Sequence, residues 1–143
     1  RSKAYLESIL VNFPENAKLF MCYYQNPETG EETALCGGLS IQYAGTTSHV
    51  YGCSTSEMRK LNPTYMMQWE MMKWALGGNC HTYDMQGIAL DEETDPELYG
   101  VYRFKAKFFG DVVETAGEFT LTFNAFADKF IAFALKMRSK LRG

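Results

Sequence analysis

The chain has 143 residues, of which 46% are hydrophobic and 22% are charged, and its formal net charge is −3. This length suits about one domain, and the composition is that of a globular protein. No apolar run approaches the roughly 18 residues that span a bilayer, so no transmembrane segment is expected. The negative charge excludes a general attraction to nucleic acid, so any RNA contact would need a local basic surface.

Hydrophobic patterning predicts a helix followed by a β-hairpin and a third strand. The helix is expected over residues 2–11, and the hairpin turn over residues 27–30, where Pro, Glu, Thr and Gly follow one another. The strands are expected over residues 18–25, 33–43 and 46–53. Both hairpin strands contain long apolar stretches, which is typical of strands covered on both faces.

A second helix is predicted over residues 63–76. Asn62 is a good N-cap, and Pro63 suits the first helical position because its missing N–H would have had no intrahelical partner. One face, which we expect to be buried, carries apolar residues at steps of four, three and four: Tyr65, Trp69, Met72 and Leu76. Two glycines then end the helix. The chain should cross over to a strand at residues 81–88 that pairs in parallel with an earlier one.

The last third of the chain carries weaker signals. Residues 89–97 hold five carboxylates, which we interpret as a solvated loop and not a calcium site. A short aromatic helix is expected over residues 99–109, and a final hairpin over residues 112–115 and 118–123. The closing helix is expected from about residue 126 to 141. Its apolar stripe consists of Phe126, Phe130, Phe133, Met137 and Leu141, and its basic residues are Lys129, Lys136, Arg138, Lys140 and Arg142. The basic residues suit the negative end of the helix dipole without RNA.

Four cysteines and two histidines are the residues that could bind a soft metal ion: Cys22, Cys36, Cys53, Cys80, His49 and His81. The cysteines have no Cys-x-x-Cys spacing and the histidines complete no ligand pattern, so no metal site is predicted. We interpret the cysteines as reduced thiols of a cytoplasmic protein, with a zinc site or a nucleophilic cysteine as the alternative.

Four segments carry a resemblance to a known family. After Tyr-Gly-Cys-Ser at residues 51–54 and Arg59, residues 62–75 read Asn-Pro-Thr-Tyr-Met-Met-Gln-Trp-Glu-Met-Met-Lys-Trp-Ala. Then come Tyr-Asp-Met-Gln-Gly-Ile at 83–88, Gly-Val-Tyr-Arg-Phe-Lys-Ala-Lys-Phe-Phe-Gly at 100–110 and Gly-Glu-Phe at 117–119. In this order the segments resemble the Fem (FemABX-type) family of aminoacyl-tRNA-dependent ligases, which build the cross-bridges of peptidoglycan.

The resemblance implies an α/β (α+β) fold of the acetyltransferase-like (GNAT) type, a mixed sheet of five to seven strands with helices on both faces. Residues 1–143 would be the second GNAT-like domain of a two-domain protein, and residues 125–143 would lead back toward a first domain that is missing here. The start at Arg1, with no signal segment, agrees with a piece of a longer polypeptide. Because the family's sites lie between the two domains, the fragment alone is expected to be inactive.

The activity implied by the resemblance is transfer of an amino acid from aminoacyl-tRNA to the stem peptide of a peptidoglycan precursor, without a cofactor. The partners would be aminoacyl-tRNA and a precursor linked to UDP or to a lipid. The protein is then expected in the cytoplasm, or at the inner face of the membrane where the lipid-linked precursor lies.

Catalysis is assigned by resemblance to Lys105, in the segment 104–108, which reads Phe-Lys-Ala-Lys-Phe. The two phenylalanines can anchor this segment and leave the lysine directed elsewhere. A fixed cation facing the transfer site would stabilise the oxyanion that forms as the ester is attacked. Ala106 and Phe109 replace a lysine and a glycine that are frequent in the family, which puts the shape of this loop in question.

Four further residues form the expected substrate-binding set. By resemblance Arg59 binds the precursor phosphates, a task that suits a guanidinium. Tyr65 could present its hydroxyl to the same ligand or belong to the core. Lys107 joins the set although the family has glycine there. Asp84 could orient a neighbouring cation or bond the backbone at its strand end, next to Gln86, which also replaces a family glycine.

Two other functions remain open. An acyl-CoA N-acetyltransferase would share the fold class, but the glycine loop that approaches a pyrophosphate is absent before the helix at residue 63. A non-catalytic module that binds a precursor or a partner is the other alternative, which the departures at Gln86, Ala106 and Phe109 keep open.

Overall fold

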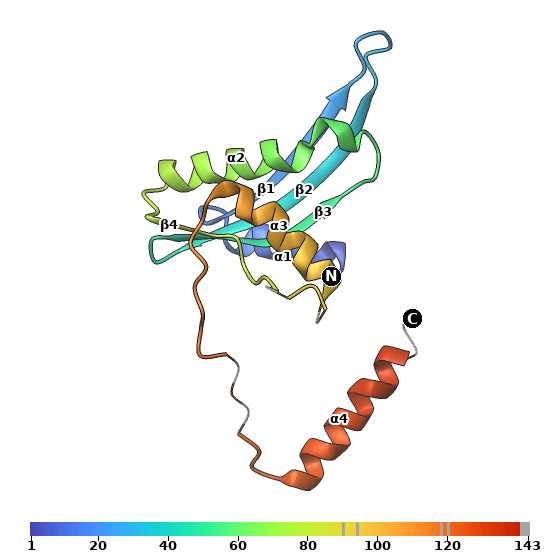
Figure 1. Cartoon of the computed structure of the whole chain (residues 1–143), viewed down its shortest axis with the longest axis vertical. Coiled ribbons are helices and arrows are strands. Elements are labelled where there is room, and N and C mark those ends of the chain that lie inside the picture. Colours follow the sequence, from blue (N-terminus) through green and yellow to red (C-terminus); the bar gives the residue numbers. More distant parts are fainter. Residues whose placement is uncertain (90, 94, 118, 120, 141–143) are drawn as a thin grey trace. The chain divides into compact units, whose positions relative to one another are not determined.

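The computed structural model describes residues 1–89, 91–93, 95–117, 119 and 121–140. The chain forms two compact units, Arg1–Phe109 and Gly110–Gly143, which are described separately (Figure 1). In the described part of the chain, no helix is both long and apolar enough to cross a membrane.

The first unit is built on a four-stranded sheet in the order β1-β2-β3-β4. Its strands are β1 (Ala17–Gln25), β2 (Glu32–Tyr43), β3 (Thr46–Ser54) and β4 (Thr82–Asp84). The first three strands pair antiparallel, whereas β4 pairs in parallel with β3. The mixed α/β class is therefore confirmed, although the described residues form four strands and not five to seven.

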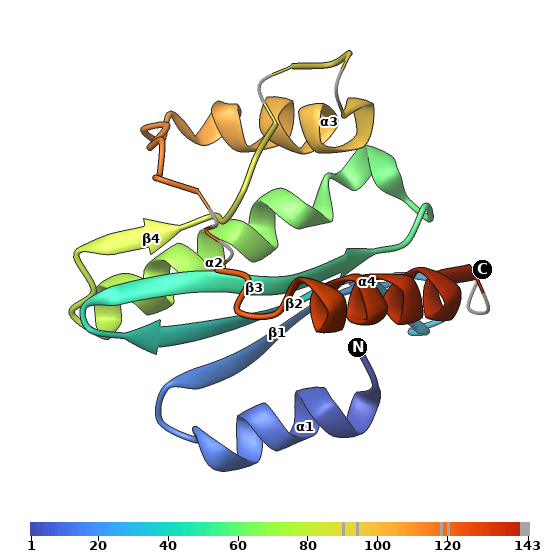
Figure 2. The same ribbon diagram turned by 90° about the horizontal axis from the view of Figure 1, so that it is seen from below.

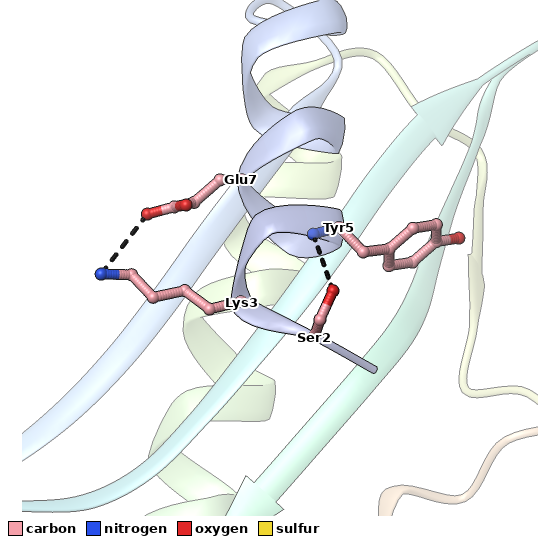
Figure 3. A network of polar contacts seen from close by, with 4 residues as sticks. All are labelled: Ser2, Lys3, Tyr5 and Glu7. Atoms are coloured by element: carbon pink, nitrogen blue, oxygen red, sulfur yellow. Dashed lines mark hydrogen bonds and ion pairs between the residues drawn. The ribbon is translucent and has the colours of Figure 1, made fainter.

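Helices cover both faces of this sheet, as predicted. Helix α1 (Lys3–Asn12) lies on one face and α2 (Pro63–Gly77) on the other (Figure 2). The Oγ atom of Ser2 caps α1 by accepting from the N–H of Tyr5 at 3.3 Å, and an ion pair joins Lys3 to Glu7 along its exposed surface (Figure 3). Because cap and ion pair both lie in the first two turns, they fix the start of this helix at Lys3.

The buried face of α2 differs from the predicted one. Five residues of the helix are buried: Pro63, Met67, Gln68, Met71 and Ala75. By contrast, Trp69 is 58% exposed and Leu76 is 72% exposed. Apolar residues surround the whole helix, so their spacing alone could not select one face. The choice is made by β2, where a Cβ atom at Gly38 would collide with the methyl groups of Met67 and Met71. Two methionines thus occupy the space that this glycine leaves open.

The start of α2 also differs from the prediction. Asn62 takes the predicted N-cap position, but it lies in the left-handed region with φ 50° and its side chain makes no capping bond. It instead ends a short 3-10 helix, η1 (Arg59–Leu61), and donates from its side chain to the carbonyl of Lys60. Pro63 takes the first helical position as predicted.

The segment after α2 is less regular than the sequence suggests. The strand predicted over residues 81–88 is only three residues long, because Gln86 adopts φ 66°, which no strand tolerates. Helix α3 (Pro96–Lys105) and the 3-10 helix η2 (Ala106–Phe108) follow, close to the predicted range of 99–109. Asp95 caps α3 by accepting from the N–H of Leu98 at 3.0 Å.

The second unit contains helix α4 (Ala125–Lys140), which confirms the predicted closing helix. The described residues of the expected hairpin, at 112–115 and 118–123, form no strand. The apolar stripe of α4 is exposed, from 87% at Phe126 to 48% at Met137. Glu118, Leu141 and Arg142, which the sequence analysis included, lie outside the described residues.

Candidate functional site

Lys105 sits at the end of α3 and reaches back to the segment that follows β4. Its ammonium donates to the carbonyl oxygens of Gln86 at 3.0 Å and Gly87 at 2.8 Å. Burial lowers the pKa of Lys105, while the nearby charge of Asp84 acts against that shift. Since an ammonium has three N–H donors, these two bonds fix its position and leave a third donor that can reach a ligand.

Asp84 ends β4 and holds the same segment. One carboxylate oxygen accepts from the backbone N–H of Gln86 at 2.7 Å and the other from its Nε2 at 2.9 Å. The sequence left two roles open for Asp84, and its hydrogen bonds are those of a residue that holds backbone at a strand end. We call Asp84, Gln86, Gly87 and Lys105 the Lys105 clasp.

An aromatic cluster docks α3 on α2 beside the clasp. The ring of Tyr65 lies 4.9 Å from that of Phe104 at an interplanar angle of 73°, and 5.5 Å from that of Phe108 at 25°. The Nζ atom of Lys107 lies 5.6 Å from the centroid of the Tyr65 ring. The two phenylalanines thus anchor the segment as predicted, while Lys105 between them reaches the carbonyl oxygens of Gln86 and Gly87. The ring of Tyr65 has a packing role, which its hydroxyl could combine with ligand binding.

Arg59 lies in a separate place, on η1. It lines an open depression of about 550 Å³ together with Tyr24, Ser56, Met58, Lys60 and Leu61. Residues 58 and 62 on either side both have positive φ, and Lys60 lines the same depression as Arg59. Within the part of the chain that is described, Arg59 shares no hydrogen bond, ion pair or ring contact with the Lys105 clasp or with Tyr65. The structure therefore groups four predicted residues and places the fifth apart.

A half-buried polar network joins β3, α2 and β4 and was not predicted. The Nδ1 atom of His49 is 2.8 Å from Nε2 of Gln68, and its Nε2 atom is 3.1 Å from the carbonyl oxygen of Tyr51. The hydroxyl of Tyr83 donates to Oε1 of Gln68 at 2.5 Å. These partners require a neutral imidazole with its proton on Nε2. The one sign of this network in the sequence is Gln68, a glutamine among the apolar residues of a predicted helix.

Two pKa shifts follow from this burial. Burial lowers the pKa of His49, the charge of Lys105 lowers it further, and only the bond to the Tyr51 carbonyl acts in the other direction. Burial also raises the pKa of Tyr83 well above its ordinary range. His49 and Tyr83 are therefore both held neutral near pH 7, because burial disfavours the charged form of each.

The cysteines and the carboxylates form no further site that the structure reveals. All four thiols are free, and burial raises the pKa of Cys36 to about 11, which keeps it protonated and unreactive. Within the described ranges, no three His, Cys, Asp or Glu side chains are close enough together to hold a metal ion.

Comparison with known proteins places this chain in a family. The model of the FemAB family matches residues 23–136, which include the clasp, Tyr65 and Arg59. The chain belongs to the FemAB family. The FemAB match also covers both units, from β1 to α4.

Several relatives are longer than this chain. Over 88 residues the chain is 36% identical to proteins named lipid II:glycine glycyltransferase from Staphylococcus epidermidis strain RP62A and Staphylococcus aureus strain USA300. The match covers 61% of this chain, and the chain spans 21% of the length of these curated relatives. A structure described as the crystal structure of FemX is 30% identical, with a TM-score of 0.46, over 72% of this chain and 22% of that one.

Proposed function

We propose that this chain is part of a FemAB-family aminoacyltransferase that moves an amino acid from aminoacyl-tRNA to the stem peptide of a peptidoglycan precursor. Membership of the family and 36% identity to two lipid II:glycine glycyltransferases support a transferase of cross-bridge synthesis. The observation that carries the proposal is the Lys105 ammonium, held by two carbonyl oxygens with one donor left.

This ammonium suits aminolysis of an ester. The acceptor amine attacks the ester carbonyl, a C–N bond forms, and the C–O bond to the tRNA ribose breaks while the amine proton ends on the ribose hydroxyl. The tetrahedral intermediate carries an oxyanion, and the third N–H of Lys105 would donate to it from a position fixed before the reaction. Because the donor ester is already activated, positioning the two reactants supplies most of the remaining acceleration.

The precursor would be held by Arg59, Tyr65 and Lys107. Arg59 and Lys60 offer two cations at one depression, which fits the phosphates of a precursor linked either to UDP or to a lipid. Tyr65 packs on Phe104, and Lys107 lies over the Tyr65 ring, so both would contact the end of the precursor that approaches Lys105. We propose that the protein works in the cytoplasm or at the inner face of the membrane.

The complete site would need more of the polypeptide than these residues. We propose that residues 1–143 act as the second GNAT-like domain beside a first domain, with α4 leading toward it. The 143-residue chain alone should then transfer nothing, whereas the longer parent protein should be active.

The test is transfer of radiolabelled amino acids from a mixture of charged tRNAs to lipid-linked and UDP-linked precursors by the full-length parent protein. Label on a precursor that disappears when the tRNA is left uncharged would support the proposal. Acyl-CoA donors are tested in parallel. Transfer from acyl-CoA alone would indicate an N-acetyltransferase, and no transfer from either donor would indicate a non-catalytic binding module.

A further inference from the structure

Within the Lys105 clasp, the backbone of Gln86 has a conformation that a glutamine side chain does not favour. Gln86 has φ 66°, in the left-handed region where a Cβ atom crowds the following carbonyl. Glycine adopts this region readily, and so do asparagine and aspartate to a lesser extent, but glutamine rarely does. An interaction outside the residue must therefore hold Gln86 in place.

Asp84 supplies that interaction from two residues upstream. Its two carboxylate oxygens accept separately from the backbone N–H of Gln86 at 2.7 Å and from the side-chain Nε2 at 2.9 Å. Backbone and side chain of the same residue are thus gripped at once. Both bonds involve an ionised acceptor, which makes them stronger than bonds between neutral groups.

The conformation of Gln86 decides where two carbonyl groups point. The left-handed turn ends β4 and directs the carbonyls of Gln86 and Gly87 to the Lys105 ammonium, at 3.0 and 2.8 Å. If residue 86 returned to an extended conformation, these oxygens would turn away and the ammonium would lose both anchors. The position of the cation therefore depends on the conformation of Gln86 and, through it, on the two bonds that Asp84 accepts.

We propose that Asp84 is a positioning residue, which fixes Gln86 in its left-handed conformation so that the carbonyls of Gln86 and Gly87 hold Lys105 at the transfer site. In this role Asp84 contacts no substrate. The inference rests on the proposed function for its kinetic consequence, whereas the clasp itself can be tested without any activity.

Glycine at position 86 provides the decisive variant. Asp84→Ala in the full-length parent protein should lower kcat by about tenfold or more, because small displacements of a catalytic group are costly, while KM for the precursor stays within about threefold. Glycine adopts the left-handed conformation by itself, so Gln86→Gly removes the need for the bonds to Asp84. The double variant Asp84→Ala/Gln86→Gly should therefore recover to within about threefold of Gln86→Gly alone. A double variant as impaired as Asp84→Ala would overturn the proposal, because a direct substrate contact is not restored by glycine.

Two control variants separate the clasp from charge and from general stability. Asp84→Asn keeps an oxygen for the backbone N–H of Gln86, and its Nδ2 can donate to Oε1 of Gln86 once the Gln86 amide turns over, so both bonds are kept without the charge. It should therefore retain most of kcat; a loss equal to that of Asp84→Ala would assign the role to the charge and overturn the proposal. Asn79→Gly replaces another left-handed residue, φ 53°, outside the clasp. Its kcat should stay within about twofold of the unchanged protein, and it should not rescue Asp84→Ala.

Hydrogen exchange of the 143-residue chain tests the clasp independently. The backbone N–H of Gln86 should be protected in the unchanged chain and in Asp84→Asn, and should exchange faster in Asp84→Ala. Equal exchange in all three chains would show that the clasp does not form, whatever the enzymatic activity. Protection as expected, without transfer by the parent protein, would leave the clasp standing and contradict the proposed function alone.

Discussion

The Nδ1 atom of His49 lies 2.8 Å from the Nε2 atom of Gln68, between the sheet and α2. Gln68 is only 2% exposed, and its amide joins a histidine of β3 to the Tyr83 hydroxyl of β4. One side chain therefore links α2, β3 and β4, and β4 is the strand that leads into the Lys105 clasp. Changes in this network should alter the stability of the fold, and changes at the Lys105 clasp should alter activity.

Replacing Gln68 by leucine should lower the free energy of unfolding by about 2 kcal/mol, because His49 and Tyr83 would lose their buried partner. Tyr83→Phe should cost about 1 kcal/mol, since it leaves the Gln68 oxygen without its donor. The double variant should cost less than the sum, because both changes break the same bond. Urea unfolding of the four chains measures this coupling, and strict additivity would show that the bond contributes nothing.

Acid should weaken the fold through His49. Its pKa is lowered in the folded state, so the unfolded chain takes up the proton first as the pH falls. The contribution of neutral His49 is complete above the ordinary histidine pKa of about 6.5, and it is lost as the pH falls from there through the lowered folded-state pKa. Urea unfolding between about pH 5 and pH 7.5 should therefore show a steeper loss in the unchanged chain than in His49→Gln. His81→Gln, which alters an exposed histidine, should keep the steep loss; a reversed order of the two variants would refute the assignment.

Two glycines should respond in opposite directions to alanine. A Cβ atom at Gly38 would collide with Met71 and approach Nε2 of His49 to 3.1 Å, whereas nothing lies within 4 Å of one at Gly77. Gly38→Ala should cost about 1–3 kcal/mol through overpacking. Gly77→Ala, at the end of α2, should add about 0.5 kcal/mol through helix propensity. Thermal unfolding of both variants distinguishes a packed position from an open one, and equal shifts would contradict the description of the α2 interface.

The sequence predicts the first three strands and α2 nearly to the residue, because turn residues mark the ends of the strands, and Pro63 and two glycines mark the ends of α2. The hairpin at residues 27–30 and the proline at the start of α2 are local signals that tertiary contacts do not override. The four motif segments, taken in order, also predict the family, which the FemAB match over residues 23–136 confirms.

Other features depend on contacts between distant residues. The buried face of α2 is set by the space above Gly38, which no periodicity within the helix reveals. The short β4 depends on the conformation of Gln86, which Asp84 and Lys105 stabilise. Equally, Gln68 in the helix sequence gives no sign that its partners lie on β3 and β4.

Tyr65 allows packing to be separated from binding. Tyr65→Phe should leave the free energy of unfolding within about 0.5 kcal/mol, because the stacked ring is kept, whereas Tyr65→Ala should cost about 2 kcal/mol. If the hydroxyl contacts the precursor, Tyr65→Phe in the parent protein should raise KM for that substrate at unchanged stability. An unchanged KM would assign Tyr65 to packing alone.

The central claim is that the Lys105 ammonium acts at the transfer site. The most direct measurement compares transfer of labelled amino acid to the precursor by the full-length parent protein and by its Lys105→Ala and Lys73→Ala variants, after circular dichroism has shown that all three are folded. Lys73 is an exposed lysine of α2 paired with Glu70 at 2.7 Å, so its variant controls for the loss of a surface charge. Lys105→Ala should lower transfer by about tenfold or more, and Lys73→Ala should leave it unchanged. Equal transfer by the unchanged protein and Lys105→Ala would contradict the account.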